Sequence, residues 1–455
     1  MMFLFNYLKL AIWSSIYFYK PNELLLKIIH KNIDDCGCIA VKFVQWMLPK
    51  IEVMYDIDKK TKENQWFYDF EGFYDKCKVH SLEETNEIYL NDFNRKLEED
   101  YTIDKMIASG SIGQVYKVHD KNDNYYALKV LHPNMGSQIY FLEMVIWLLY
   151  RFPPTKNYLL YKLPMSLKDF ISDFKLQTNL INEGNNCIQF YHEYKENDYI
   201  IIPEVFQLSK NTLVMSYEEG EKFDDIQMSD YKKAQIQMIL KLFIKNNQHY
   251  FFMHGDLHKG NWKVRDGEKI VIYDFGYCWN VPKYLQDSFD IVDKAFLDID
   301  NPEKVKKGFV EAMYMFSNKS VNKSIIKSEV DKLSKTLKCD DPSFLLKLMI
   351  NCLKDSDVLL ESYVLNGLIL HNQMERNLIK YNVTITNKSG KLGEISNTYY
   401  KKKINDIICF CETNNIFKKY REHLQEEYDS ECIIMNELFE TVKFNIPNLK
   451  ELAIS

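Results

Sequence analysis

The chain has 455 residues, of which 46% are hydrophobic, and this suits a globular protein with one two-lobed unit and an extension. Its net charge of −6 gives no general attraction for nucleic acid, and no basic run or RNA-binding signature occurs, so we expect no nucleic-acid partner. Ten cysteines without a CxxC spacing predict reduced thiols in an intracellular compartment. The two CxC pairs, Cys36/Cys38 and Cys409/Cys411, lack the accompanying His or Cys ligands of a zinc site.

The first twenty residues are largely apolar and aromatic, with polar interruptions at Asn6, Lys9, Ser14 and Ser15. These interruptions argue against a membrane span, which needs about 20 apolar residues. The pattern favours a packed N-terminal helix, with a helix at the membrane interface as the alternative. Because no cleavage site or import signal occurs, the expected location is cytoplasmic or peripherally membrane-associated.

Residues 21–97 predict helices separated by turns. One apolar helix covers Leu24 to Ile29, and another covers Ile39 to Leu48. The second helix carries Lys42 and Gln45, which are three positions apart and therefore lie on one helix face.

Alternating patterns from Tyr101 onward predict three strands, at residues 101–107, 113–119 and 125–131. The first two enclose a run of small residues that would let backbone N–H groups approach phosphates. The candidate nucleotide contacts in this run are Ala108, Ser109, Gly110, Ser111, Gly113 and Gln114. Glycine at position 110 permits a positive φ and a close approach of the loop to a ligand. The third strand carries Lys129, a candidate for binding α- and β-phosphates.

An apolar helix is predicted over residues 139–152, followed by a turn at Pro153 and Pro154. This helix is too short to span a membrane. A further helix is predicted over residues 176–194, and it carries Glu183.

Two more strands are predicted at residues 199–203 and 212–217. After them, residues 218–220 are interpreted as a hinge whose backbone would meet an adenine ring. Met215 and Glu218 are the candidate nucleotide contacts in this part of the chain.

The segment from His254 to Asn261 reads HGDLHKGN, and a predicted strand at residues 269–273 leads into YDFG. Asp256 is followed by Asn261 five positions later and by Asp274 eighteen positions later. This order and spacing is typical of a kinase-fold phosphate site. Asn261 and Asp274 would supply oxygen ligands for Mg²⁺, and Asp256 would act as the base or orient the acceptor oxygen. His254 is expected to be a packing residue.

Beyond Gly276 the pattern is mostly helical, and the predicted helices cover residues 284–298, 302–316, 325–337, 343–353 and 359–379. This part has no APE-like anchor and no threonine or tyrosine set among basic residues as a phosphorylation switch. A protein substrate is therefore not expected.

These motifs resemble those of the UbiB/ADCK (aarF-domain) family of atypical protein-kinase-like ATPases, over roughly residues 36–330. The run SIGQVYKV followed by YALKV is similar to the family's loop, in which alanines replace the glycines of ordinary kinases. Gly110 departs from that loop towards the ordinary kinase form. Lys42 and Gln45 match the family's KxGQ motif, with Val44 in place of its glycine.

The resemblance implies roles for several of these residues. Lys42 and Gln45 would lie over the nucleotide site and exclude protein substrates. Glu183 matches the family's EAxN motif, with Gly184 in place of the alanine, and would hold the ammonium group of Lys129 on the phosphates.

The predicted fold is α+β, a two-lobed protein-kinase-like fold with an N-terminal helical extension and a helical C-terminal lobe. The expected domains are the extension (1–97), a small β-rich lobe with a helical insertion (98–218) and the helical lobe (219–455). By resemblance, the cofactors are ATP and Mg²⁺, and the activity is that of an ATPase or an ATP-dependent lipid or small-molecule kinase. A lipid, a quinone precursor and a membrane surface are the candidate partners beyond ATP and ADP.

Two alternatives remain at this stage. HGDLHKGN also resembles aminoglycoside and choline phosphotransferases, but those usually carry a different acidic motif than DFG and lack the SIGQ loop. The other alternative is a nucleotide-binding scaffold without turnover. The presence of Lys129, Asp256, Asn261 and Asp274 argues against an inactive site.

Overall fold

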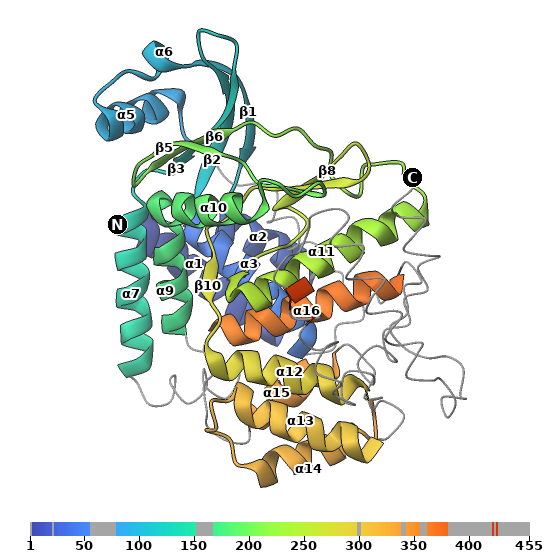
Figure 1. Ribbon diagram of the computed structural model, residues 1–455. Helices are drawn as coiled ribbons and strands as arrows, with labels where there is room; N and C mark the ends of the chain where they lie inside the picture. Colours follow the sequence, from blue (N-terminus) through green and yellow to red (C-terminus); the bar gives the residue numbers. More distant parts are fainter. Residues whose placement is uncertain are drawn as a thin grey trace. The chain divides into compact units, whose positions relative to one another are not determined.

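Two compact units make up the computed structural model (Figure 1), which describes residues 2–20, 22–54, 79–151, 167–297, 302–337, 343–354, 362–380, 421, 422 and 425. The first unit comprises Met1–Lys156, Leu167–Ile188 and Pro203–Glu218, and the second comprises Asn157–Ser166, Gln189–Ile202 and Glu219–Ser455. The predicted turn at Pro153 and Pro154 and the pair Cys409/Cys411 lie outside the described residues.

Three helices open the first unit: α1 (Met2–Tyr19), α2 (Glu23–Cys36) and α3 (Cys38–Met54). Asn22 caps α2, because its side chain accepts a hydrogen bond of 2.8 Å from the backbone N–H of the third helical residue. Gly37, with a φ of 93°, separates α2 from α3 in a conformation that favours glycine.

One side of α1 packs against α2 and α3. The buried members of this apolar cluster are Ile29, Ile33, Cys36, Ala40 and Val41, and the partly buried members are Tyr7, Leu10, Trp13, Tyr17 and Val44. The other side of α1 is apolar too, and it exposes Phe5, Leu8, Ile12 and Ile16. Among the described helices, none combines the length and the apolar character that a membrane span requires.

A five-stranded antiparallel sheet follows, with the strand order β1-β2-β3-β6-β5. Its strands are β1 (Thr102–Ser109), β2 (Gly113–His119), β3 (Tyr125–Leu131), β5 (Val205–Leu208) and β6 (Thr212–Ser216). β2 and β3 have the predicted bounds, and β1 and β6 differ from theirs by one or two residues at an end. β5 was not predicted, because its four residues are all at least partly exposed and show no alternation of burial.

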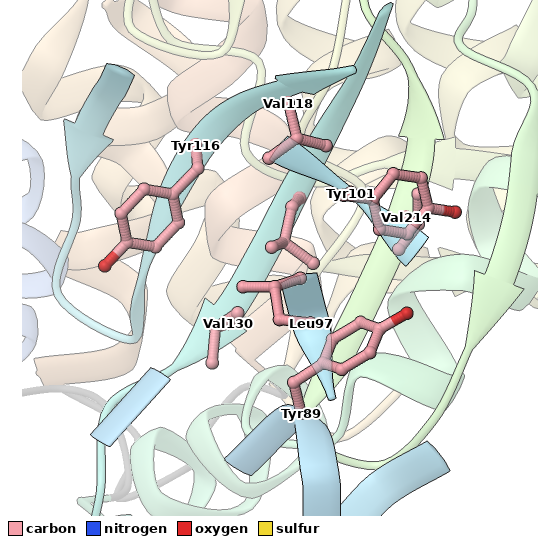
Figure 2. Packing of buried hydrophobic residues seen from close by; sticks show 8 residues of the cluster. Tyr89, Leu97, Tyr101, Tyr116, Val118, Val130 and Val214 are labelled. Atoms are coloured by element: carbon pink, nitrogen blue, oxygen red, sulfur yellow. The ribbon is translucent and has the colours of Figure 1, made fainter. Parts of the chain in front are cut away.

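One face of this sheet packs against α5 (Leu82–Phe93) and the short α6 (Leu97–Asp100). Figure 2 shows the buried cluster, whose members are Tyr89, Leu97, Tyr101, Tyr116, Val118, Leu128, Val130 and Val214. Successive side chains of a strand point to opposite faces. Leu128 and Val130 therefore face this cluster, and Lys129 between them faces the other side of the sheet.

Three helices follow in the chain: α7 (Met135–Arg151), α9 (Leu167–Gln177) and α10 (Leu180–Tyr194). α7 and α9 pack side by side (Figure 1). The predicted continuous helix over residues 176–194 is divided in two at Asn179, whose side chain accepts a hydrogen bond of 3.2 Å from the backbone N–H two residues later. Asparagine competes in this way with helical hydrogen bonding.

Two small sheets belong to the second unit. One has the order β4-β9-β8, formed by β4 (Ile200–Ile201), β9 (Lys269–Ile272) and β8 (Trp262–Arg265). The other pairs β7 (Phe252–His254) with β10 (Cys278–Asn280).

The strand predicted at residues 199–203 has another partner than expected. It was grouped with the β-rich lobe, but Ile200 and Ile201 pair in parallel with Ile270 and Val271 of β9. This pairing buries Ile200, Ile270 and Val271 almost completely. An apolar segment this short gives no indication of which distant strand it will join.

The helices of the second unit are α11 (Asp230–Tyr250), α12 (Lys283–Leu297), α13 (Pro302–Phe316), α14 (Lys323–Leu333), α15 (Phe344–Lys354) and α16 (Ser362–Lys380). α13 has the predicted bounds, and α14 ends at Leu333 rather than at residue 337. α11 was not predicted, because the buried polar residues Gln237, Asn246 and Asn247 interrupt its apolar stripe.

Candidate active site

The turn between β1 and β2 carries the predicted phosphate contacts of the first unit. The Gly110 N–H donates a hydrogen bond of 2.9 Å to the Gly113 carbonyl, and the backbone N–H of His132 donates one of 2.9 Å to the Ile112 carbonyl. The Nε2 atom of His132 also lies 3.0 Å from the Gly110 carbonyl oxygen. His132, directly after β3, therefore holds this loop at two points.

The two glycines of the loop have different requirements. A Cβ atom at Gly113 would collide with the backbone carbonyl of Val130, so the close approach of β2 to β3 requires glycine there. Gly110 has no positive φ, and a Cβ atom there would meet only the Gly113 oxygen, at 3.7 Å. Gly110 therefore does not adopt the positive φ that glycine permits, and alanine would fit this backbone.

The loop opens towards solvent at its start and is buried at its end. Ala108 is exposed, Ser109 and Gly110 are partly exposed, and Gln114 is fully buried. The Oε1 atom of Gln114 accepts a hydrogen bond of 3.1 Å from the His80 N–H, and its Nε2 donates one of 3.0 Å to the His80 carbonyl. Gln114 was expected to contact a nucleotide, but these bonds commit its amide to supporting the loop.

Helix α3 reaches the loop through Gln45. The Ser111 hydroxyl donates a hydrogen bond of 3.2 Å to Gln45 Oε1. Lys42 lies about one turn earlier on the same helix and, like Gln45, is partly buried. Val44, which stands where the KxGQ motif has glycine, packs against the apolar cluster of α1, α2 and α3. The departure from the motif at Val44 therefore has a packing reason.

Lys129 and Glu183 form a buried ion pair within the first unit. The Lys129 Nζ atom lies 2.6 and 2.8 Å from the two carboxylate oxygens of Glu183. The side chains are 6% and 1% exposed. Removing one partner of such a pair leaves a buried charge uncompensated, which costs about 3–5 kcal/mol. The structure therefore brings together the two residues that the motifs assigned to each other.

Gly184, next to Glu183, lets α10 approach the sheet. A Cβ atom at Gly184 would collide with the side chain of Leu208 in β5. Glycine at the position where the EAxN motif has alanine therefore leaves room for this leucine.

The predicted adenine contacts lie at the end of the first unit. Met215 is buried in β6, where it pairs with Ala127. The Ser216 hydroxyl donates a hydrogen bond of 2.7 Å to Glu218 Oε1. The first unit ends at Glu218, so the predicted hinge at residues 218–220 lies where the chain passes into the second unit.

The second unit holds the acidic residues of the predicted site, which His254 organises. Its Nε2 atom lies 2.5 Å from the Asp274 carbonyl oxygen, and its Nδ1 accepts a hydrogen bond of 3.3 Å from the Asp256 N–H. Burial lowers the pKa of His254, so the ring is neutral and carries its proton on Nε2. His254 was expected only to pack, but it ties the HGD segment to the YDFG segment.

Asp256, Asn261 and Asp274 lie in one hydrogen-bonded network. The Asn261 Nδ2 atom donates a hydrogen bond of 2.7 Å to the Asp256 carbonyl, which orients the amide and leaves its Oδ1 to serve as a ligand. The Tyr273 N–H donates one of 3.2 Å to the Asn261 carbonyl. The Gly276 N–H donates one of 3.1 Å to Asp274 Oδ1.

The side-chain oxygens of Asn261 and Asp274 suit a Mg²⁺ ion, but they are too few to bind a metal ion without further ligands. Asn261 and Asp274 offer one amide and one carboxylate, and Mg²⁺ commonly takes its other ligands from phosphates and water. Across the described parts of the chain, no group of three or more His, Cys, Asp or Glu side chains could hold a metal ion. Asn261 and Asp274 are therefore candidate ligands for a Mg²⁺ ion that also binds phosphates.

The sequence motifs predicted no role for His258. Its Nδ1 accepts a hydrogen bond of 3.0 Å from the Gly260 N–H, and its Nε2 lies 3.8 Å from Asp256 Oδ1. The ring therefore faces the predicted base. Its position in the sequence, as the second histidine of HGDLHKGN and two positions after Asp256, could have indicated that it lies near this aspartate.

Comparison with known proteins gives a family match and several relatives. The family model of the ABC1 atypical kinase-like domain matches residues 72–307. A probable serine/threonine-protein kinase, abkC, of Dictyostelium discoideum is 28% identical over 310 residues, which are 61% of this chain and 43% of the relative. AarF domain-containing kinase 1 of Drosophila melanogaster is 24% identical over 43% of this chain and 39% of its own length.

The probable protein kinase UbiB of Sodalis glossinidius is 20% identical over 62% of this chain and 54% of its own length. The chain thus spans about half the length, or less, of these curated relatives. Among solved structures, the complex of Rv3197 with erythromycin from Mycobacterium tuberculosis is similar at a TM-score of 0.44 and 15% identity, over 66% of this chain and 83% of that one.

Proposed function

The chain belongs to the ABC1 atypical kinase-like family, and from this membership we propose that it binds Mg-ATP and acts as an ATP-dependent phosphotransferase or ATPase. The membership confirms the predicted α+β, two-lobed kinase-like fold and the resemblance to UbiB/ADCK proteins. Family membership does not determine which reaction the protein catalyses or which acceptor it uses.

The buried Lys129–Glu183 pair carries this proposal. Replacing a buried ion pair with well-packed apolar residues is often neutral or stabilising, so stability alone gives little reason for the pair. A lysine held beside a phosphate-binding loop has a use, because its ammonium group can bind α- and β-phosphates while Glu183 keeps it in place. Both side chains are nearly inaccessible to water, which strengthens their mutual attraction.

The acidic residues of the second unit would supply the groups for phosphoryl transfer. Asn261 and Asp274 would hold Mg²⁺, which when bound neutralises charge on the phosphates. Asp256 would accept the proton of the attacking hydroxyl or water, or orient that oxygen. The Nε2 atom of His258 lies 3.8 Å from the Oδ1 atom of this carboxylate.

We place the acceptor among lipids and small molecules, including quinone precursors, rather than proteins. The hydrogen bond between Ser111 and Gln45 supports this, because it holds α3 on the loop that would cover the phosphates. The exposed apolar side of α1, with Phe5, Leu8 and Ile12, would suit a lipid surface. The segment after Phe275 offers no anchor for a protein substrate.

Two measurements test the proposal. Mg-ATP at about 100 times its Kd should stabilise the protein by about 2.7 kcal/mol in a thermal unfolding experiment, and ATP with EDTA should not. Phosphate release should then be followed with and without detergent-solubilised lipid or quinone-like phenols, and we expect these additions to raise it. An absence of any shift with Mg-ATP contradicts the proposal, and a shift without phosphate release would identify a nucleotide-binding scaffold.

A further inference from the structure

A continuous series of hydrogen bonds runs behind the phosphate-binding loop, entirely within the first unit. Its members are Gln114, Tyr116, Thr85, His80, His132 and the carbonyl of Gly110. The His80 and His132 rings meet at their Nδ1 atoms, 2.8 Å apart, although the residues are 52 positions apart in the sequence. The rings are 8% and 6% exposed. Two buried imidazoles in direct contact require a definite arrangement of protons.

That arrangement follows from the end of the series at Gly110. A carbonyl oxygen only accepts, so His132 must carry a proton on Nε2, 3.0 Å from it. In a neutral ring the Nδ1 of His132 then accepts, and His80 must donate from its own Nδ1. The remaining His80 Nε2 accepts from the Thr85 hydroxyl at 3.0 Å.

The series continues in the same direction beyond Thr85. Since the Thr85 hydroxyl donates to His80, its oxygen accepts from the Tyr116 hydroxyl at 2.9 Å. The Tyr116 oxygen in turn accepts from the Gln114 amide. A competing acceptor for Thr85, the Ser81 carbonyl, lies farther away at 3.4 Å. Every donor in the series therefore points towards the loop.

Both rings are neutral near pH 7. Burial, with a further contribution from His132, lowers the pKa of His80 to about 4. Burial also lowers the pKa of His132, against the opposite effect of its bond to Gly110. Glu84, in the first turn of α5, has a smaller and opposite effect, because its charge raises the pKa of both rings. Tyr116 of β2 is connected to His80 through the Thr85 hydroxyl.

We propose that His132 is a positioning residue of the phosphate-binding loop, which donates from Nε2 to the Gly110 carbonyl while its Nδ1 accepts from His80. The same residue holds the Ile112 carbonyl through its backbone N–H, so the loop is attached on both sides of its tip. His132 follows Lys129 by three positions, and β3 therefore serves as the common base of the loop and of the lysine. The importance of this arrangement for nucleotide binding rests on the proposed function.

The first test replaces His132 with leucine and follows the loop without any nucleotide. Backbone amides of residues 109–114 should exchange with deuterium about tenfold faster in His132→Leu, because loss of one hydrogen bond of about 1.4 kcal/mol corresponds to that factor. His132→Gln, whose amide can still donate to Gly110, should stay within about threefold of the wild type. His119→Leu is the matched control, since His119 pairs with Asp104 near the other end of β2.

The second test separates positioning from general damage by comparing ligands. In His132→Leu the affinity for Mg-ATP should fall about tenfold and the affinity for adenosine should change less than about twofold, because adenosine has no phosphates for the loop to bind. An equal loss for both ligands overturns the proposal. Unchanged loop exchange in His132→Leu overturns it as well.

Imidazole ¹⁵N–¹H spectra of the wild type test the tautomers even where a variant fails to fold. We expect a proton on Nε2 of His132 and on Nδ1 of His80, and the reverse tautomer in either ring overturns the proposal. A wild-type protein that shows these tautomers and a loop held by His132, but binds no nucleotide, would support the holding of the loop and contradict the proposed function.

Discussion

The candidate site residues of the two units differ in how their charges are balanced. In the first unit, Lys129 and Glu183 neutralise each other out of contact with water. In the second unit, the Asp256 side chain is 35% exposed, Asp274 is partly exposed, and backbone N–H groups hold the loops that carry them. Lys129 and Glu183 therefore balance each other's charge with or without a ligand. Under the proposed function, a cation would balance the carboxylates of the second unit. Substitution of Lys129 or Glu183 should accordingly damage folding, whereas substitution of Asp274 should damage binding.

The largest effect is expected for Lys129→Met, which leaves Glu183 buried without a counter-charge. It should lower the free energy of unfolding by about 3–5 kcal/mol. The double variant Lys129→Met/Glu183→Leu should recover most of this loss, because it removes both charges. Urea unfolding of the variants measures the difference.

The exposed pair Lys175–Glu143 provides the matched control. Its atoms approach to 2.6 Å, but the side chains are 50% and 40% exposed. Lys175→Met should therefore cost less than about 1 kcal/mol. If Lys129→Met costs no more than Lys175→Met, the buried pair is not part of what holds the first unit together.

Asp274→Asn should have the next largest effect, and it should act on binding alone. A neutral amide cannot offset the charge of a metal–phosphate group, so the affinity for Mg-ATP should fall about 100-fold, or about 2.7 kcal/mol. The melting temperature without nucleotide should stay that of the wild type. Calorimetric titration, with and without EDTA, gives the affinities.

Asp266→Asn is the control for this carboxylate-to-amide change, because Asp266 is an exposed turn residue of the same unit with a φ of 56°, which asparagine tolerates. It should leave the affinity for Mg-ATP unchanged. Mg-dependent binding that persists undiminished in Asp274→Asn would show that this aspartate does not hold the metal.

Gln45→Ala tests whether α3 restrains the loop that carries Ser111. The substitution removes the hydrogen bond from Ser111, worth about 1 kcal/mol or roughly a fivefold change in an equilibrium. We expect a rise of that order in autophosphorylation or in phosphorylation of a generic basic protein, and the same direction for Lys42→Ala. Gln138→Ala in α7 is the matched control. If neither Gln45→Ala nor Lys42→Ala differs from it, α3 does not guard the site.

Gly110→Ala should have the smallest effect. The backbone accommodates alanine, so only the added methyl group distinguishes the variant. It should weaken Mg-ATP relative to Mg-ADP by about threefold. Gly136→Ala in α7, where a Cβ atom meets nothing within 4 Å, is the control. An unchanged ratio of the two affinities in Gly110→Ala would mean that this position does not set nucleotide preference.

Local patterns in the sequence predicted several elements and the order of the candidate site residues. The bounds of β2 and β3 follow from alternation within seven residues each, and the order of Asp256, Asn261 and Asp274 follows from spacing along the chain. Such features depend on neighbours in the sequence. For the same reason α13 was predicted with its observed bounds.

Contacts between distant segments were not predictable in the same way. The pairing of β4 with β9, the meeting of His80 with His132 and the packing of Val44 all join residues that no local pattern relates. The role of Gln114 was mistaken for this reason, since its partner His80 lies 34 positions away. Side-chain partners of this kind are decided by tertiary packing.

The fit of Leu208 against Gly184 also constrains how such a sequence can change over time. A mutation of Gly184 to alanine meets the leucine already in place, whereas a prior mutation of Leu208 to a smaller residue would remove the obstacle. The order of the two substitutions therefore matters, and each is conditional on the other. We therefore expect alanine at position 184 to arise only after Leu208 has been replaced by a smaller residue.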